Sequence, residues 1–168
     1  KGEHWWELRA CDYYDEFENR KIIYPNICKR PEFAFDQNGI YTNQKCFIIP
    51  TDNMYLLGML NSSTTYFLFR SILPKLRGDF YEPSYVYFKD FPIRTIDFSN
   101  SADAARHDRM VSLVDPLLSL HKQLHEARTP HAQPALQRQI EAIAGQIDAL
   151  VYELYGLTEE EIKIVESV

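Results

Sequence analysis

Glycine is scarce in this sequence of 168 residues, and its six copies are widely separated. The two that lie closest together, Gly145 and Gly156, are eleven residues apart. Phosphate-binding loops and dinucleotide fingerprints need several glycines within about six residues, so the sequence contains neither. The same spacing excludes an S-adenosylmethionine pocket of the glycine-rich kind, and no Asn-Pro-Pro-Tyr segment is present to hold a flipped adenine. Methyl transfer is therefore not encoded here.

Cysteines and long apolar runs are also few. The three cysteines, Cys11, Cys28 and Cys46, form no CxxC pair, which excludes a zinc ribbon or a dithiol redox site and predicts idle thiols in a reducing cytoplasm. No apolar run reaches the ~20 residues that a membrane helix needs. No signal peptide opens the sequence and its first residue is Lys1, so we expect a cytoplasmic protein and a fragment of a longer one.

The composition is that of a folded domain with an uneven charge. Hydrophobic residues make up 45% and charged residues 25%, which allows a core, and aromatic residues reach 14%. The net charge of −6 argues against a protein that coats nucleic acid by bulk attraction. Residues 1–100 nevertheless hold 12 basic and 13 acidic side chains, whereas residues 101–168 hold 6 and 11. A local basic surface can therefore form in the first part.

Residues 1–98 predict a mixed α+β domain rich in antiparallel strands. Apolar, β-favouring runs predict strands at residues 21–24, 32–35, 40–42 and 45–49, with a tight turn at Asn38–Gly39 and an antiparallel meander overall. Helical spacing follows at residues 54–61 and again at 65–73, where Pro74 ends it. Residues 85–88 predict one further strand.

Residues 99–168 predict a helical hairpin, coiled-coil-like, that acts as a spacer after the first domain. One helix begins at Ser101, and we expect a kink or restart at Pro116. A turn over residues 129–134 leads to a second helix, whose apolar residues keep an a/d heptad spacing from 136 to 154. Gly156 ends that helix, and a capping box at Thr158 begins a short last one.

Candidate catalytic and metal sites are weak. His121 and His125 are spaced to share a metal ion, but no third ligand is evident, so seam or surface histidines are the better interpretation. Glu161 and Lys163 resemble the Glu-x-Lys end of a nuclease motif, yet their context is helical, where residues two apart diverge by about 200°. The acidic cluster in residues 12–18 singles out no catalytic pair, and no nucleophile has a histidine nearby. We expect no catalytic or metal-binding residue, and a hidden hydrolase remains as a minor alternative.

The signal for nucleic-acid binding is stronger. Three pairs of basic residues are interleaved with aromatic ones: two pairs flank the proposed strands, and the third lies in a loop at residues 73–78. The pairs are Arg20 with Lys21, Lys29 with Arg30, and Lys75 with Arg77, and the aromatic residues include Tyr41, Phe80 and Tyr81. Arg suits bidentate contact with guanine edges, and Lys suits phosphate. The plain alternative is that each pair only solvates a strand end.

A set of segments, in order, resembles the C-terminal specificity domain of TaqI-like restriction–modification enzymes. The segments are KIIYP at 21–25, FAFD at 33–36, GIY at 39–41, DNMYLLGMLNS at 52–62, LRG at 76–78 and FPI at 91–93. Residues 148–162 are similar to the closing helix of the bifunctional type IIG enzymes. Two positions depart from the family: Pro116 interrupts a helix that usually continues, and Asp79 stands where a second glycine is common.

The resemblance implies a target-recognition module that binds a short sequence of double-stranded DNA. A separate upstream domain, of a methyltransferase or a type IIG enzyme with a nuclease, would then methylate adenine with S-adenosylmethionine. The expected DNA contacts are Lys29, Arg30, Lys75 and Arg77, followed by Arg20, Lys21, Tyr41 and Tyr81. Asn61 and Ser62 are expected to shape helix ends instead. The alternative is a protein-interaction module that acts through the heptad helices, which could also self-associate.

Overall fold

The first part of the chain forms a three-stranded antiparallel sheet from its β-branched and aromatic segments. The computed structural model describes residues 4, 12–127 and 132–167. A one-turn helix precedes the sheet, and β1 lies at its centre, paired with β2 on one side and β3 on the other. The elements are α1 (Asp15–Glu18), β1 (Lys21–Pro25), β2 (Ala34–Asp36) and β3 (Cys46–Ile49). Ile22 of β1, opposite both Phe35 and Ile49, is fully buried.

Two helices, α2 (Met54–Leu60) and α3 (Ser63–Ile72), follow the sheet, and polar residues fix the junction between them. Asn61 ends α2, and its side chain accepts a hydrogen bond from the N–H of Phe33 (3.0 Å) and donates one to the Phe33 carbonyl (2.9 Å). Ser62 caps α3 by accepting from the N–H of Thr65. Asn61 and Ser62 are thus helix-end residues, as the sequence predicts.

A short hairpin and a one-turn helix complete this part. The hairpin consists of β4 (Lys75–Leu76) and β5 (Phe80–Tyr81), and α4 (Tyr85–Phe88) comes directly after it. Gly78 and Asp79 form its turn with φ values of 84° and 61°. Positive φ is easy for glycine but uncommon for aspartate.

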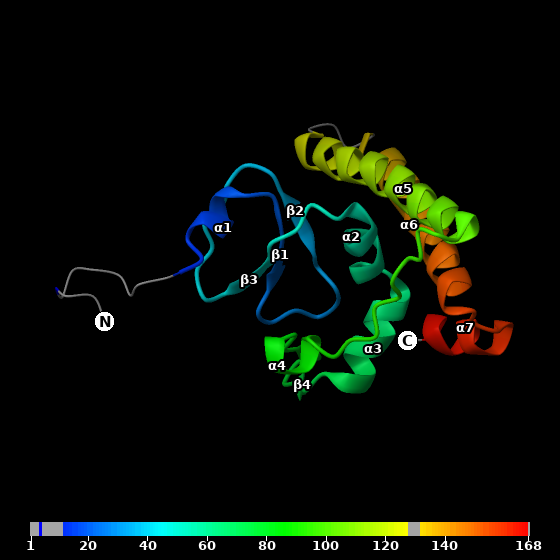
Figure 1. The fold of residues 1–168 in the computed structure, drawn as a ribbon, viewed down its shortest axis with the longest axis horizontal. Helices are drawn as coiled ribbons and strands as arrows, with labels where there is room; N and C mark the ends of the chain where they lie inside the picture. Colours follow the sequence, from blue (N-terminus) through cyan, green and yellow to red (C-terminus); the bar gives the residue numbers. More distant parts are fainter. Residues whose placement is uncertain (1–3, 5–11, 128–131, 168) are drawn as a thin grey trace.

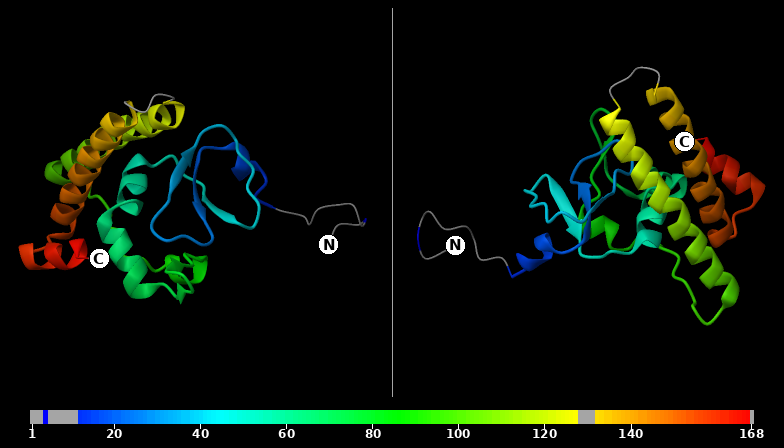
Figure 2. Two further views of the ribbon diagram at one scale, coloured as in Figure 1. Left: turned by 180° about the vertical axis from the view of Figure 1, so that it is seen from behind. Right: turned by 90° about the horizontal axis from the view of Figure 1, so that it is seen from above.

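The last part is an antiparallel pair of long helices followed by a short one. They are α5 (Ser101–Glu126), α6 (Ala132–Tyr155) and α7 (Glu159–Glu166). Figure 2 shows α5 and α6 side by side, covering one flank of α2 and α3. The side chain of Thr158 and that of Glu161 bond each other's backbone N–H, so the expected capping box of α7 is confirmed.

The two parts share one hydrophobic core, which lies between the sheet, α2, α3 and the long helices (Figure 1). Where α2 packs against α5, Gly58 of α2 faces α5. A Cβ atom at position 58 would lie 2.6 Å from the sulfur of Met110 and 2.9 Å from a methyl group of Val114. Glycine is therefore required here by the close approach of the two helices. The boundary at residues 98/99 stays a prediction.

The α+β class is confirmed, but several elements differ from expectation. The meander is wrong, because β1 is central and β2 does not pair with β3. Residues 40–42 form no strand: the Asp36 carboxylate accepts from the N–H groups of Asn38 (2.9 Å) and Ile40 (2.8 Å) and holds this segment as a loop. Gly39 does take the expected positive φ of 69°. Residues 85–88 are the helix α4, which turns Phe88 toward Tyr24, Phe33 and Phe91.

The helical hairpin also differs in detail. Helix α5 continues through Pro116 as one helix, so the restart, one of the two expected outcomes, does not occur. Val114 and Leu120, on either side of Pro116, are buried. Of the expected turn, residues 129–131 lie outside the described residues, and residues 132–134 already belong to α6. Cys28 and Cys46 carry free thiols, and Cys11 lies outside the described residues. Over the described ranges, we find no helix with the length and apolar character that crossing a bilayer requires.

Candidate nucleic-acid interface

A backbone pairing joins the loop after β1 to the β4–β5 hairpin. The N–H of Tyr81 donates to the carbonyl of Cys28 (2.7 Å), and the N–H of Cys28 donates to the carbonyl of Tyr81 (3.1 Å). The pairing fixes Lys29 and Arg30, which follow Cys28, beside the hairpin that carries Lys75 and Arg77. Two basic pairs that are far apart in the sequence therefore meet at one end of the molecule.

The contacts of Lys29 and Lys75 show that the two segments are neighbours. The ammonium group of Lys29 lies 5.0 Å from the ring centre of Phe80, in a cation–π contact. Lys75 forms an exposed ion pair with Asp79 at 2.8 Å. The hydrogen bond from Lys75 lowers the pKa of Asp79, and the charges of Lys29 and Arg70 lower it further. Several cations therefore surround this one carboxylate.

Arg70 is a member of this group that the sequence did not reveal. It is exposed in the last turn of α3, and its charge reaches both Lys75 and Asp79. Arg70 is the single charged residue of its helix, so it does not stand out as part of a basic pair. If residues 63–72 are drawn as a helix, Arg70 falls in its last turn, a few residues before the hairpin begins at Lys75. That position could have identified it from the sequence. We call Lys29, Arg30, Arg70, Lys75 and Arg77 the hairpin basic surface.

A hollow of about 480 Å³ opens within the hairpin basic surface. Its walls combine cations, aromatic rings and one acid, and are formed by Ile27, Cys28, Lys29, Arg30, Glu32, Tyr66 and Phe80. Burial, followed by the negative charge of Glu32, raises the pKa of the Cys28 thiol to about 11, so this thiol stays protonated at neutral pH. A site with donors, aromatic faces and one acceptor suits the edges of bases.

Lys21, expected at the DNA contact, is a core residue instead. Its side chain is fully buried, and its ammonium group lies 2.5 Å from the carboxylate of Asp36 and 2.5 Å from the carbonyl oxygen of Phe17. Burial alone would raise the pKa of Asp36, but hydrogen bonds from Lys21 and from two backbone N–H groups hold this pKa below its usual value. An ammonium group that is paired in this way cannot reach a duplex, so the prediction for Lys21 is wrong.

The other three second-rank residues also lie outside the hairpin basic surface. Tyr81 is 4% exposed and belongs to the hydrophobic core, so we withdraw it as a contact. Tyr41 is exposed, but its ring stacks on Phe17 and its hydroxyl donates to Glu18 (3.0 Å), which raises the pKa of Tyr41. Arg20 is exposed between α1 and β1. Tyr41 thus lies against α1, and Arg20 comes just after that helix, so neither belongs to the segments that carry the hairpin basic surface.

The histidine pair and the Glu161–Lys163 motif both lie on helices in the described part of the chain. His121 and His125 lie exposed on α5, and we find no set of three or more His, Cys, Asp or Glu side chains there that could hold a metal ion. Glu161 accepts from the N–H of Thr158 at 2.8 Å, so it serves as a helix cap. Its partner in the nuclease-like motif, Lys163, lies on the same helix α7, as the helical context predicts.

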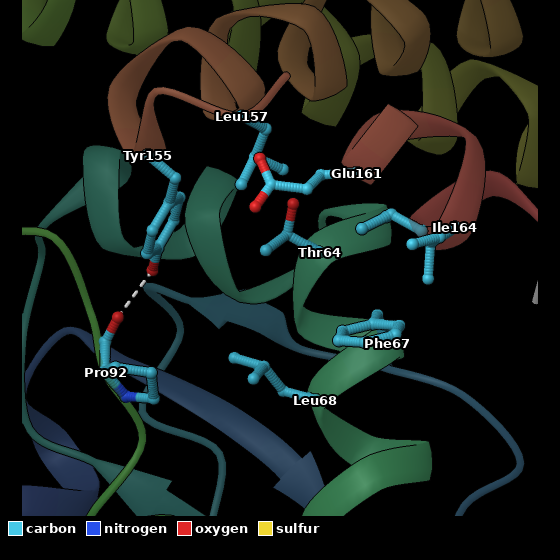
Figure 3. Close-up of a pocket in the computed structure, with 9 residues that line it drawn as sticks. Thr64, Phe67, Leu68, Pro92, Tyr155, Leu157, Glu161 and Ile164 are labelled. Carbon is cyan, nitrogen blue, oxygen red and sulfur yellow. Dashed lines mark hydrogen bonds between the residues drawn. The ribbon is translucent and has the colours of Figure 1, made fainter. Parts of the chain in front are cut away.

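A second cavity, of about 320 Å³, is apolar and carries no cation. Figure 3 shows it between α3, which contributes Thr64, Phe67 and Leu68, and α7, which contributes Ile164. Its floor is tied together by Tyr155, whose hydroxyl donates to the carbonyl of Pro92 (2.6 Å). With no cation in its lining, this cavity offers nothing to a phosphate backbone.

Comparison with known proteins identifies the family. A search of curated proteins finds no match to this chain. The family model described as TaqI-like C-terminal specificity domain matches residues 2–93, more than half of the chain. The matched region contains the sheet, α2, α3, the hairpin basic surface and α4. The chain belongs to the family of TaqI-like C-terminal specificity domains.

Proposed function

We propose that this chain is the sequence-specific DNA-recognition module of a restriction–modification enzyme that methylates adenine, of the methyltransferase or type IIG class. The observation that supports this most strongly is the Cys28–Tyr81 pairing, which gathers Lys29, Arg30, Lys75 and Arg77 on one surface of a protein with a net charge of −6. Family membership supplies the expectation that such a surface recognises DNA.

The cations on this surface would divide the work of binding. Lysines such as Lys29 and Lys75 suit phosphate oxygens, which set the position of the module on the duplex. Arg77, exposed in the turn of a two-stranded hairpin, has the length and the fork geometry to reach a guanine edge. A two-stranded ribbon is narrow enough to enter the major groove.

The chemistry would reside in a methyltransferase domain outside this chain, and S-adenosylmethionine would bind there. The glycine spacing of this sequence does not fit a glycine-rich S-adenosylmethionine pocket, so we assign that cofactor no site here. The long helices would space the recognition module from that domain.

The alternative, a protein-interaction module that uses the heptad seam, has less support. Four seam residues of α6, Ile140, Ile147, Leu150 and Leu154, are buried, and the last three belong to the same core as the sheet. A seam that is already packed inside its own chain offers little surface to a partner.

The test is a selection of random-sequence duplexes on the purified chain at about 100 mM salt, followed by sequencing of the retained DNA. An enriched motif of several base pairs supports the proposal. Salt-sensitive binding without any enriched motif contradicts sequence recognition by this chain, and an absence of binding at about 20 mM salt contradicts DNA binding altogether.

A further inference from the structure

Glu32 is the one acidic residue in the wall of the hollow within the hairpin basic surface. It is exposed, and it shares this wall with Lys29 and Arg30. Among the described residues, however, its carboxylate forms no hydrogen bond or ion pair with either cation. The carboxylate therefore remains available to a donor from outside the chain.

The backbone on both sides of Glu32 is held firmly. Before it, Pro31 restricts the chain, and Cys28 is fixed by its pairing with Tyr81. After it, the side chain of Asn61 bonds both the N–H and the carbonyl of Phe33, whose ring is buried. Glu32 thus stands at a defined place beside the cations, as a residue that recognises a base must.

A carboxylate at this place opposes binding of phosphate, since it repels the anion that the neighbouring cations attract. It is suited to a different partner. Among the groups on base edges in the major groove, the N4 amino group of cytosine donates to Glu or Asp, and the O6 and N7 atoms of guanine accept from Arg or Lys. Donors and one acceptor side by side therefore match the edge of a G·C pair.

Resting on the proposed function, we infer that Glu32 is a base-recognising residue of this chain. Its carboxylate accepts a hydrogen bond from the N4 amino group of a cytosine, while Arg30, in the same wall, donates to a guanine of the same or the adjacent pair. Asn61 acts as a positioning residue, because it fixes the backbone next to Glu32. Glu32 thus gives the chain specificity for cytosine at one position of the target sequence.

The test compares duplex selection by the parent chain with selection by Glu32→Gln, in which an amide replaces the carboxylate. Glu141→Gln, on the exposed face of α6, removes the same charge away from the hollow and is the matched control. Thermal unfolding of all three chains establishes that they are equally folded. The parent and Glu141→Gln should then yield the same motif.

For Glu32→Gln we expect the preference for cytosine over the other bases to fall by roughly 5-fold to 150-fold at one position, with the rest of the motif kept. If Glu32→Gln keeps the full motif and only binds every duplex more tightly, Glu32 merely repels DNA and the inference is wrong. If the parent itself enriches no motif, it is the proposed function that fails, so the two failures are distinguishable.

Discussion

Asp148, in the middle of α6, caps the first turn of α3 from the side. Its carboxylate accepts hydrogen bonds from the backbone N–H and from the hydroxyl of Ser63, each at 2.7 Å. The N-terminus of α3 thereby has a carboxylate beside it from a residue 85 positions later in the sequence. These bonds join the helical hairpin to the part of the chain that carries the basic surface.

From this relationship we expect Asp148→Ala to lower the free energy of unfolding by about 1–2 kcal/mol, because the N–H and the hydroxyl of Ser63 lose their acceptor while the Ser62 cap stays in place. Asp148→Asn should cost less, since the amide oxygen can still accept from the Ser63 N–H. Urea unfolding, followed by circular dichroism, measures both. Equal stability of Asp148→Ala and the parent would show that the cap adds nothing.

Lys21 provides the second prediction, which separates a core role from a DNA contact. Lys21→Ala leaves the buried carboxylate of Asp36 without its counter-charge and should lower the free energy of unfolding by about 3–5 kcal/mol. The neighbouring substitution Arg20→Ala, at an exposed position, should change it by less than about 0.5 kcal/mol. A Lys21→Ala chain as stable as the parent that had lost affinity for DNA would contradict our assignment.

The same ion pair predicts sensitivity to acid. The pKa of Asp36 in the folded protein lies below its usual value, so the unfolded chain binds a proton more readily. The stability that this pair contributes is fully present above about pH 4, the ordinary pKa of aspartate, and is lost as the pH falls through the lower folded value. Unfolding measured between pH 6 and pH 2 should show the loss, and Asp36→Asn should flatten it.

Gly58 yields a prediction about packing. In Gly58→Ala the new methyl group would meet Met110 and Val114 at distances that real contacts do not show. Although alanine favours a helix over glycine by about 1 kcal/mol, we expect a net loss of about 1–3 kcal/mol from overpacking. Thermal unfolding measures whether stability falls or rises. A Gly58→Ala chain more stable than the parent would mean that Met110 and Val114 of α5 move aside at little cost.

Asp79 yields a prediction about the salt dependence of binding. It takes a positive φ in the hairpin turn, and its carboxylate pairs with Lys75. Asp79→Gly should relieve the backbone and free Lys75 for phosphate, which steepens the dependence of log affinity on log salt by about one. Asp79→Asn frees Lys75 without relieving the backbone, so it should match Asp79→Gly in salt dependence but not in stability. Unchanged salt dependence in both variants would place Lys75 outside the interface.

The sequence predicted the elements whose signal is local. The change from strand to helical spacing after Pro50, the end of α3 near Pro74 and the capping box at Thr158 all depend on neighbouring residues, and the structure contains them. Local signals failed where a residue distant in the sequence determines the backbone conformation. Asn38–Gly39 suggested a tight hairpin, but the buried Lys21–Asp36 pair draws Asp36 into a loop contact instead.

The candidate site was only partly predictable for the same reason. Basic pairs were visible in the sequence, but the backbone pairing of Cys28 with Tyr81 joins segments that no short-range pattern connects. Burial of Lys21 and Tyr81 depends on packing around them, and the contribution of Arg70 depends on where α3 ends. Of the eight residues named from the sequence, four belong to the hairpin basic surface. Arg20, Lys21 and Tyr41 lie elsewhere, and Tyr81 is part of the hairpin but is buried.

The most direct test of the account is the affinity of the Arg77→Ala chain for the duplex that the parent selects and for random duplex, measured at one salt concentration. Arg138→Ala, on the exposed side of α6, is the control and should bind as the parent does. We predict that Arg77→Ala weakens binding to the selected duplex by roughly 1–3 kcal/mol and barely changes binding to random duplex. Unchanged binding to both duplexes would contradict the assignment of the hairpin basic surface as the DNA-recognition surface.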